Sequence, residues 1–564
     1  MPIARSEIRS LLVATAAGLA LAPAASAAPA PAVAKPPATP PPLVWTDCGG
    51  GFQCATATVP LSYAQPRAGT TTIALVKKPA TGDPAQRIGS LFTNPGGPGG
   101  SGTSFVRATA GSLYATLNTR YDIVGFDPRG TGESGGALDC GVNQETDGIY
   151  SQPFPTPKTV DPGGLLRKDA AYVARCVQKN RAILPFVTTG NVARDLDGLR
   201  AQVGDQKLNY LGFSYGTFLG ATYSAMYPNR IGHVVLDGPL DASQYVNDPQ
   251  TNLAEQTAGF EDSLDRFLDA CKADQVACAG FGGADPHAAY DALLAKADAT
   301  PLLADSYPDD PRPVDGDDIR FATSGMLYAK FLWPYLAQEL AAAQAGDGGP
   351  LRAEVDGSYG YDPADGSFDP GNDRYFLIGA IDQVKGYPHG NLLQYFRSGA
   401  KAYREAPHFW FNNGYVELNY GLFTVPADGL FRGPFRVPGK ANTPLVVATT
   451  HDPATPYGGA LGLVKQLGNA RLLTMEGDNH TAYGGESPCI DAGVEAYLFD
   501  GTLPAAGTVC QQEHPFAQPE PEPSTEALSG STERSARARP AAIRAITQAA
   551  QPGGPGTKPV DPAN

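Results

Sequence analysis

The chain has 564 residues, of which 42% are apolar, so it can bury a sizeable core in one large domain with an insertion or in two domains. Its formal charge is −15 and its isoelectric point is near 4.9, which argues against the basic surface of a typical nucleic-acid-binding protein. The 66 glycines and 52 prolines indicate many loops without reaching a low-complexity composition.

The first 27 residues have the pattern of a secretory signal peptide. Two arginines precede a short apolar run at 11–22, and Ala-Ser-Ala at 25–27 forms a cleavage site. The apolar run is too short to span a membrane. The first cysteine, Cys48, is not near the cleavage site, which argues against a lipid anchor. We therefore expect a secreted protein with no membrane anchor, in which residues 28–44 form an Ala/Pro-rich linker or pro-segment.

The eight cysteines also support secretion. Their number is even and no two have the C-x-x-C spacing of a metal site, which indicates disulfides. Sequence alone leaves the connectivity open, and we expect cysteines that are neighbours along the chain to pair. The expected disulfides are Cys48–Cys54, Cys140–Cys176, Cys271–Cys278 and Cys489–Cys510.

Apolar runs and turn signals alternate through residues 45–240, the expected first part of the core. The runs that predict strands are 71–77, 88–93, 121–126, 208–212 and 233–236, and helices are expected at 191–203 and 215–225. Strands that alternate with helices predict a mostly parallel α/β sheet.

This alternation stops at residues 241–440, which we interpret as an inserted cap. The segment contains a helical pattern at 335–345 and Gly/Asp/Pro-rich loops around 346–375. The core resumes over 441–518, with strands expected at 444–449 and 470–475 and a helix at 491–499. The composition of residues 519–564 predicts a disordered tail.

A serine between two glycines, Gly212-Phe213-Ser214-Tyr215-Gly216, lies between a predicted strand and a predicted helix. This is the context that the nucleophile-elbow motif requires. The tight turn strains the serine backbone and lifts its hydroxyl above the sheet, and the glycines let the strand and helix approach closely. The motif therefore predicts Ser214 as a nucleophile.

A neutral serine needs a base that is itself oriented by an acid. The chain order for this elbow is Ser, then Asp or Glu, then His. Asp452 follows the predicted strand 444–449, and His480 follows the last predicted strand. Because sites in such folds form at the carboxyl ends of strands, we expect Ser214, Asp452 and His480 to act together.

Other residues compete for these roles. Asp237 follows the strand at 233–236 and is an alternative acid, whereas His233 lies inside that strand and is expected to pack. His451 is an alternative base, although its neighbour Asp452 could not easily orient it. Asp478 is readily explained as a turn residue.

The oxyanion hole needs two backbone donors. We expect one to be the N–H of Tyr215 and the other to be the N–H of Gly97, in the glycine-rich loop 94–102. That loop lacks the lysine and spacing of a Walker phosphate-binding loop. No metal or cofactor is implied by this chemistry.

These motifs together resemble the secreted tripeptidyl aminopeptidases of actinobacteria, in the proline-iminopeptidase-like group of α/β-hydrolase serine peptidases. The resemblance covers roughly residues 45–520. It rests on NPGGPGGSG at 94–102, FDPRGTGES at 126–134, GFSYGT at 212–217, DPATP at 452–456 and the stretch from NHT at 479–481 to Cys510.

The resemblance implies an α/β-hydrolase fold that cleaves short peptides from free N-termini beneath a cap whose acidic residues hold the substrate amino group. The family often has an A-I-x-C-x-D pattern in that cap, and the chain has Ala380-Ile381-Asp382-Gln383-Val384-Lys385 instead. In strict register the acid falls on Lys385, and Asp382, three positions earlier, is the candidate amino-group ligand from this partial match, with a solvated or structural acid as the alternative.

The sequence therefore predicts a secreted serine exopeptidase that acts on peptides with free N-termini. It is expected to release short peptides, with tripeptides as the main expected product. A secreted esterase with the same triad is the alternative, and it would need no carboxylate in the cap. A non-catalytic binding protein on the same scaffold is a third possibility, which the intact triad disfavours.

Overall fold

A ten-stranded sheet runs through residues 42–517, the part of the chain that the computed structural model describes. The strands lie in the order β1-β2-β3-β5-β4-β6-β7-β10-β11-β12. They are β1 (Thr46–Asp47), β2 (Gln53–Pro60), β3 (Thr70–Lys78), β4 (Gly89–Asn94), β5 (Tyr121–Phe126), β6 (Leu208–Phe213), β7 (Ile231–Asp237), β10 (Leu445–Thr449), β11 (Arg471–Glu476) and β12 (Val509–Gln511). The expected signal peptide, nearly all of the linker and the tail lie outside the described residues.

Most of the sheet is parallel, as the sequence predicts. Every pairing from β5 across to β12 is parallel, and only the pairings among β1, β2, β3 and β5 are antiparallel. The central strands β4 and β5 are buried along their whole length, which is typical of parallel strands covered on both faces. Every strand expected from an apolar run is present, with ends that differ by at most two residues.

Helices cover both faces of the sheet. The covering helices outside the insertion are α1 (Gly102–Thr109), α4 (Thr189–Gln202), α5 (Tyr215–Met226), α15 (Tyr457–Leu467) and α16 (Pro488–Asp500), while α2 (Gln144–Asp147) and α3 (Pro162–Asn180) lie between β5 and α4 in the chain. Side chains of α1 and α16 pack with Leu91, Leu211 and Val447 in one core cluster. Side chains of α4, α5 and α15 pack with Phe92, Tyr210 and Val446, their neighbours along the same strands, in another. Alternate strand residues thus face opposite cores.

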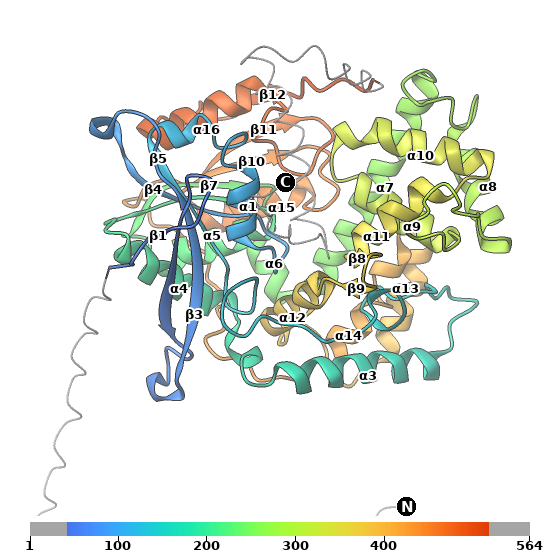
Figure 1. The fold of residues 1–564 in the computed structure, drawn as a ribbon, viewed down its shortest axis with the longest axis horizontal. Coiled ribbons are helices and arrows are strands. Elements are labelled where there is room, and N and C mark those ends of the chain that lie inside the picture. The colour runs from blue at the N-terminus through green and yellow to red at the C-terminus, as the bar shows by residue number, and fades with distance from the viewer. Residues whose placement is uncertain (1–41, 518–564) are drawn as a thin grey trace, which may run out of the picture. The chain divides into compact units, whose positions relative to one another are not determined.

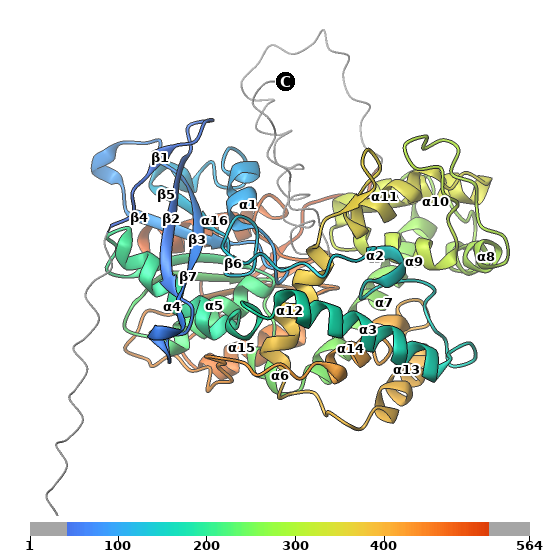
Figure 2. The ribbon, with the colours of Figure 1, turned by 60° about the horizontal axis from the view of Figure 1, so that its bottom comes forward.

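The chain between β7 and β10 is helical, although these two strands are direct neighbours in the sheet. Figures 1 and 2 show these helices, green to orange, gathered beside the sheet rather than within it. They are α6 (Ala242–Asn247), α7 (Pro249–Ala273), α8 (Pro286–Ala299), α9 (Gly316–Met326), α10 (Trp333–Ala345), α11 (Gly349–Tyr359), α12 (Gly371–Gln383), α13 (Leu393–Glu405) and α14 (Glu417–Leu422), with a hairpin of β8 (Tyr361–Asp362) and β9 (Ser367–Phe368). We call this segment the insert.

The expectation of loops around 346–375 is wrong in part, because α11 and the β8–β9 hairpin lie there. Gly346 ends α10 and Gly360 ends α11, both in the left-handed conformation that a helix C-terminus favours. Pro350 lies in the first turn of α11, where the missing N–H costs no hydrogen bond. The glycines and the proline of this stretch therefore delimit helices instead of excluding them.

Four disulfides join the cysteines in the pairs that the sequence predicts. They are Cys48–Cys54, Cys140–Cys176, Cys271–Cys278 and Cys489–Cys510. The last of these ties α16 to the edge strand β12, downstream of β11. Within residues 42–517, no helix has both the length and the apolar character that crossing a membrane requires.

Candidate active site

Ser214 lies on a strained corner between β6 and α5. Its φ of 55° and ψ of −127° fall outside the regions that residues other than glycine usually occupy. A Cβ at Gly212 would lie 2.5 Å from the Gly216 carbonyl oxygen, and one at Gly216 would lie 2.7 Å from the Asn94 carbonyl oxygen. The two glycines flanking the serine are therefore required by the close approach of strand and helix, as the sequence pattern predicts.

Asp452 and His480 meet at the carboxyl ends of β10 and β11. Nδ1 of His480 lies 2.9 Å from both carboxylate oxygens of Asp452, and both side chains are buried. The carboxylate also accepts hydrogen bonds from the N–H groups of Ala454 and Thr455 and from the Thr455 hydroxyl, at 2.8–2.9 Å. An acid held by this many donors can fix the orientation of the imidazole.

Ser214 and His480 both lie beside the end of β7. The N–H of Ser214 donates to the carbonyl of Asp237 at 2.9 Å, and a Cβ on the next residue, Gly238, would lie 3.2 Å from Cε1 of His480. Nε2 of His480 is buried and has no hydrogen-bond partner in residues 42–517. The imidazole thus has a nitrogen without a partner among the described residues, next to the strand end that also holds the backbone of Ser214.

A cavity opens at Ser214, and we call it the near cavity. Its wall includes Gly97, Ser214, Tyr215, Tyr328 and Thr455. His480 lies behind this wall, because its N–H donates to the Tyr328 carbonyl at 2.7 Å and its Nδ1 is 3.3 Å from the Thr455 hydroxyl. A substrate in this cavity would therefore contact Ser214, and His480 lies directly behind two of the wall residues.

The two expected oxyanion donors both line the near cavity. Tyr215 is the first residue of α5, so its N–H has no acceptor within the helix. Gly97 has a φ of 105°, which favours glycine. A Cβ at its neighbour Gly96 would lie 2.9 Å from Cβ of Ser214, so the glycine-rich loop packs directly on the serine corner.

The competing residues have other partners. Asp237 accepts hydrogen bonds from the N–H groups of Ala482 and Tyr483 at 2.9–3.1 Å, and burial raises its pKa to about 7. It therefore holds the loop that follows His480. His451 pairs with Asp262 in the insert at 3.1 Å. His233 packs against Tyr497 and contacts the Leu498 carbonyl.

Asp382, the expected amino-group ligand, is buried on α12 and does not line the near cavity, whereas its neighbour Gln383 does. One carboxylate oxygen accepts from the Thr189 N–H at 2.9 Å and the other from the Thr189 hydroxyl at 2.5 Å. The Tyr215 hydroxyl lies 3.5 Å from the second oxygen. Asp382 thus lies behind Tyr215, a residue that lines the near cavity.

The insert also holds the loop that carries His480, which sequence reasoning did not anticipate. Ala329 forms an antiparallel bridge with Asn479, and the Lys330 N–H donates to the Asn479 side chain at 3.0 Å. Asp478 is paired with Arg266 and, at 3.1 Å, with Lys330. Burial alone would raise the pKa of Asp478, but these two cations outweigh burial and lower it. Asp478 is therefore more than a turn residue.

Thr455 was also missed as a site residue, although its position three residues after Asp452 is a familiar side-chain-to-backbone turn spacing. For metals, one group of potential ligands within residues 42–517 combines Cys140, Cys176 and Asp373. The two sulfur atoms of that group are joined in a disulfide, so it does not form a metal site.

Comparison with known proteins places the chain in a family. A model described as the alpha/beta hydrolase fold matches residues 90–486. Serine protease Hip1 of Mycobacterium tuberculosis is 33% identical over 498 residues, which cover 83% of this chain and 91% of that protein. Tripeptidyl aminopeptidase of Streptomyces lividans is 32% identical, with coverage of 85% and 87%, and carboxylesterase B of Mycobacterium tuberculosis is 31% identical, with coverage of 81% and 86%.

The chain belongs to the α/β-hydrolase family. It is a serine hydrolase, and within that class it is related to serine proteases and aminopeptidases, the tripeptidyl aminopeptidases of Streptomyces among them.

Buried acids of the insert predict that the protein becomes less stable as the pH rises. Burial raises the pKa of Asp382 to about 7 and that of Glu417 to about 8, from ordinary values near 4. Between those values the folded chain binds more protons than the unfolded chain, so stability falls with increasing pH. We expect a lower Tm at pH 8.5 than at pH 5.5.

Glu417→Gln should reduce this pH dependence, because the amide remains neutral throughout. The expected reduction is about 1–3 kcal/mol in the difference between the unfolding free energies at the two pH values. Glu405→Gln, which removes an exposed carboxylate, is the matched control. An unchanged pH dependence in Glu417→Gln would show that Glu417 is ionised in the folded protein at both pH values.

Proposed function

We propose that this protein is a secreted serine exopeptidase that releases short peptides, tripeptides in the first place, from free N-termini. The observation that carries the catalytic part is the buried pair of Asp452 and His480, whose Nε2 has no partner among the described residues and whose ring lies at the same strand end as the strained Ser214. Peptidases among the relatives support a peptide substrate. Four disulfides and the signal-peptide pattern of residues 1–27 support secretion.

In the proposed mechanism, the Ser214 hydroxyl oxygen attacks the scissile carbonyl carbon while Nε2 of His480 takes its proton. Asp452 keeps the Nδ1 proton of His480 in place and stabilises the imidazolium. The N–H groups of Tyr215 and Gly97 stabilise the negative oxygen of the tetrahedral intermediate. Nε2 then returns the proton to the leaving amine, and water hydrolyses the acyl-enzyme by the same steps.

Recognition of a free N-terminus needs a counter-charge, because an ammonium group buried without one is costly. Asp382 is our proposal for that role, and its carboxylate reaches the near cavity only through Tyr215. The described wall of the near cavity has no Asp or Glu. This observation favours a second candidate function, an esterase with the same triad, whose substrates need no carboxylate partner.

Ser214→Ala should lower kcat by several orders of magnitude while leaving the fold intact, because the hydroxyl lies at a cavity and makes little packing contact. Ser224→Ala, on the same helix, is the control. The Ser224 hydroxyl is buried without a partner in residues 42–517, so its loss should leave activity near wild type. Labelling by a fluorophosphonate probe should follow the same pattern. Retention of more than a few per cent of kcat by Ser214→Ala would reject the nucleophile assignment.

Asp452→Asn should lower kcat by about 10⁴ at neutral pH, by analogy with other Ser-His-Asp enzymes, because the amide favours the wrong tautomer of His480. Asp237→Asn is the matched comparison, since its remaining carbonyl oxygen can still accept from the backbone of Ala482 or Tyr483. We expect it to cost far less activity. The reverse ranking of the two variants in steady-state kinetics would move the acid to Asp237.

An unblocked tripeptide arylamide should be cleaved about 30- to several-thousand-fold faster, in kcat/KM, than its N-acetylated form, because acetylation removes the charge-assisted contact. Asp382→Asn should narrow this ratio by slowing the unblocked substrate, whereas the exposed-site variant Glu405→Gln should not. Equal cleavage of both arylamides, or preference for simple esters, would replace the exopeptidase by the esterase.

A further inference from the structure

A second cavity adjoins the near cavity on the side of the insert, and we call it the far cavity. The two share five wall residues, Leu253, Gln256, Tyr328, Tyr375 and Tyr420. Residues that line only the far cavity are Tyr150, Phe260, Phe321, Ser324, Gly325, Ser358, Phe411, Asn412 and Val416. The shared residues therefore place the far cavity directly beside the cavity that contains Ser214.

The walls of both cavities carry no charged side chain among the described residues, and no histidine. Aromatic rings dominate the far cavity, and its polar groups are amides and hydroxyls, such as Gln256, Asn412 and Ser324. Burial raises the pKa of Tyr375 to about 12 and that of Tyr420 well above its ordinary value, so these phenols stay neutral at physiological pH. The far cavity is thus an uncharged, aromatic compartment.

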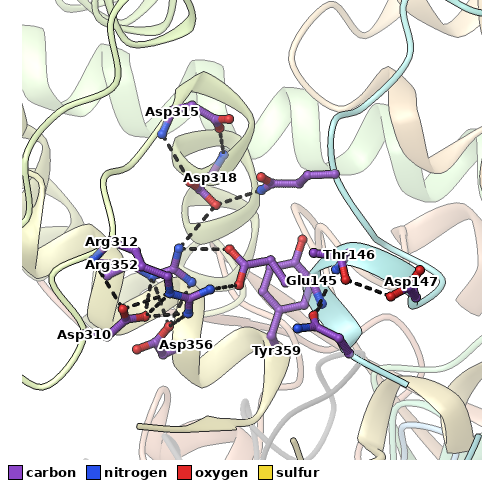
Figure 3. A network of polar contacts seen from close by, with 12 residues as sticks. Glu145, Thr146, Asp147, Asp310, Arg312, Asp315, Asp318, Arg352, Asp356 and Tyr359 are labelled. Atoms are coloured by element: carbon purple, nitrogen blue, oxygen red, sulfur yellow. Dashed lines mark hydrogen bonds and ion pairs between the residues drawn. The ribbon is translucent and has the colours of Figure 1, made fainter. Parts of the chain in front are cut away.

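Charged residues do lie behind one wall of the far cavity, but they are paired with one another. Figure 3 shows Arg352, which is 1% exposed, among the carboxylates of Glu145, Asp310 and Asp356. The network holds elements that supply far-cavity residues. It includes α11, which carries Ser358, and the Tyr359 hydroxyl donates to the Tyr150 carbonyl at 2.9 Å. The charges therefore fix the wall without contributing to its surface.

We propose that the far cavity is a specificity subsite for an uncharged aromatic or bulky aliphatic side chain, two or three residues from the scissile bond on the acyl side of the substrate. The assignment rests on the proposed serine hydrolase function and adds a substrate class to it. Apolar side chains gain by leaving water for this wall. A charged side chain would lose its hydration and find no counter-charge.

The wild-type enzyme tests this with matched side chains. Norleucine and lysine have similar shapes and differ in charge, and they are placed at Xaa in Xaa-Ala-Ala and Ala-Xaa-Ala p-nitroanilides. In at least one of the two positions, kcat/KM should be about tenfold or more higher for norleucine, and higher for phenylalanine than for alanine. The proposal would be overturned if kcat/KM were equal for the norleucine and lysine substrates at both positions, or higher for lysine.

Two wall positions provide the variants. Ser324→Phe fills the far cavity and should reduce the phenylalanine-to-alanine ratio by about tenfold, whereas Ser324→Ala, which removes the same hydroxyl without filling space, should preserve the ratio. Asn412→Asp introduces a negative charge and should raise the lysine-to-norleucine ratio. Misfolding cannot produce this gain, because it would lower kcat/KM for both substrates by the same factor. An unchanged lysine-to-norleucine ratio in a folded Asn412→Asp would count against the subsite.

The same series, prepared as p-nitrophenyl esters, separates this inference from the proposed function. If only the esters are cleaved, the exopeptidase function fails while the ranking of side chains still tests the subsite. If Ser214 is labelled by fluorophosphonate and neither series discriminates between norleucine and lysine, the subsite fails alone. If Ser214→Ala keeps full activity and the ranking persists, the catalytic assignment fails alone.

Discussion

The buried contact between His480 and Asp452 is the constraint on which the site depends. The Nε2 of His480 is buried and has no partner among the described residues, and it stays available only while the other ring nitrogen keeps facing the acid. The sheet supplies the acid, since Asp452 follows β10 and is bonded by the backbone of Ala454 and Thr455. The insert holds the backbone at this position, since the Tyr328 carbonyl accepts a hydrogen bond from the backbone N–H of His480.

This arrangement makes the insert part of the catalytic support as well as a cover for the cavities. Two contacts join the insert to the loop just before His480. They are the bridge between Ala329 and Asn479 and the ion pair between Lys330 and Asp478. A displacement of the insert would therefore reach the base directly. Residues 328–330 therefore both line the near cavity, through Tyr328, and contact the loop of His480, through Tyr328, Ala329 and Lys330.

Local sequence signals predict seven strands of the sheet and the strand ends that Ser214, Asp452 and His480 follow, whereas they do not predict β1, β2 and β12. The seven predicted strands are apolar runs of ordinary length, and each of the three residues lies within four residues of the end of such a strand, so sequence distance reports spatial position. Contacts between distant segments had no such signal. The partner of Asp382 is Thr189, which is 193 residues away, and nothing in the pattern around either residue indicates the pairing.

Asp382 also shows why a motif match cannot assign a binding role by itself. The position along α12 puts an acid near the cavities, but the neighbouring Gln383 faces the near cavity and Asp382 faces Thr189, because adjacent residues of a helix point in different directions. Both carboxylate oxygens are already bonded, and the buried acid has a pKa raised to about 7. A substrate ammonium group in the near cavity would therefore have to interact with the Asp382 carboxylate across Tyr215. The neutral walls of the two cavities therefore favour selection by the shape and polarity of side chains over selection by charge.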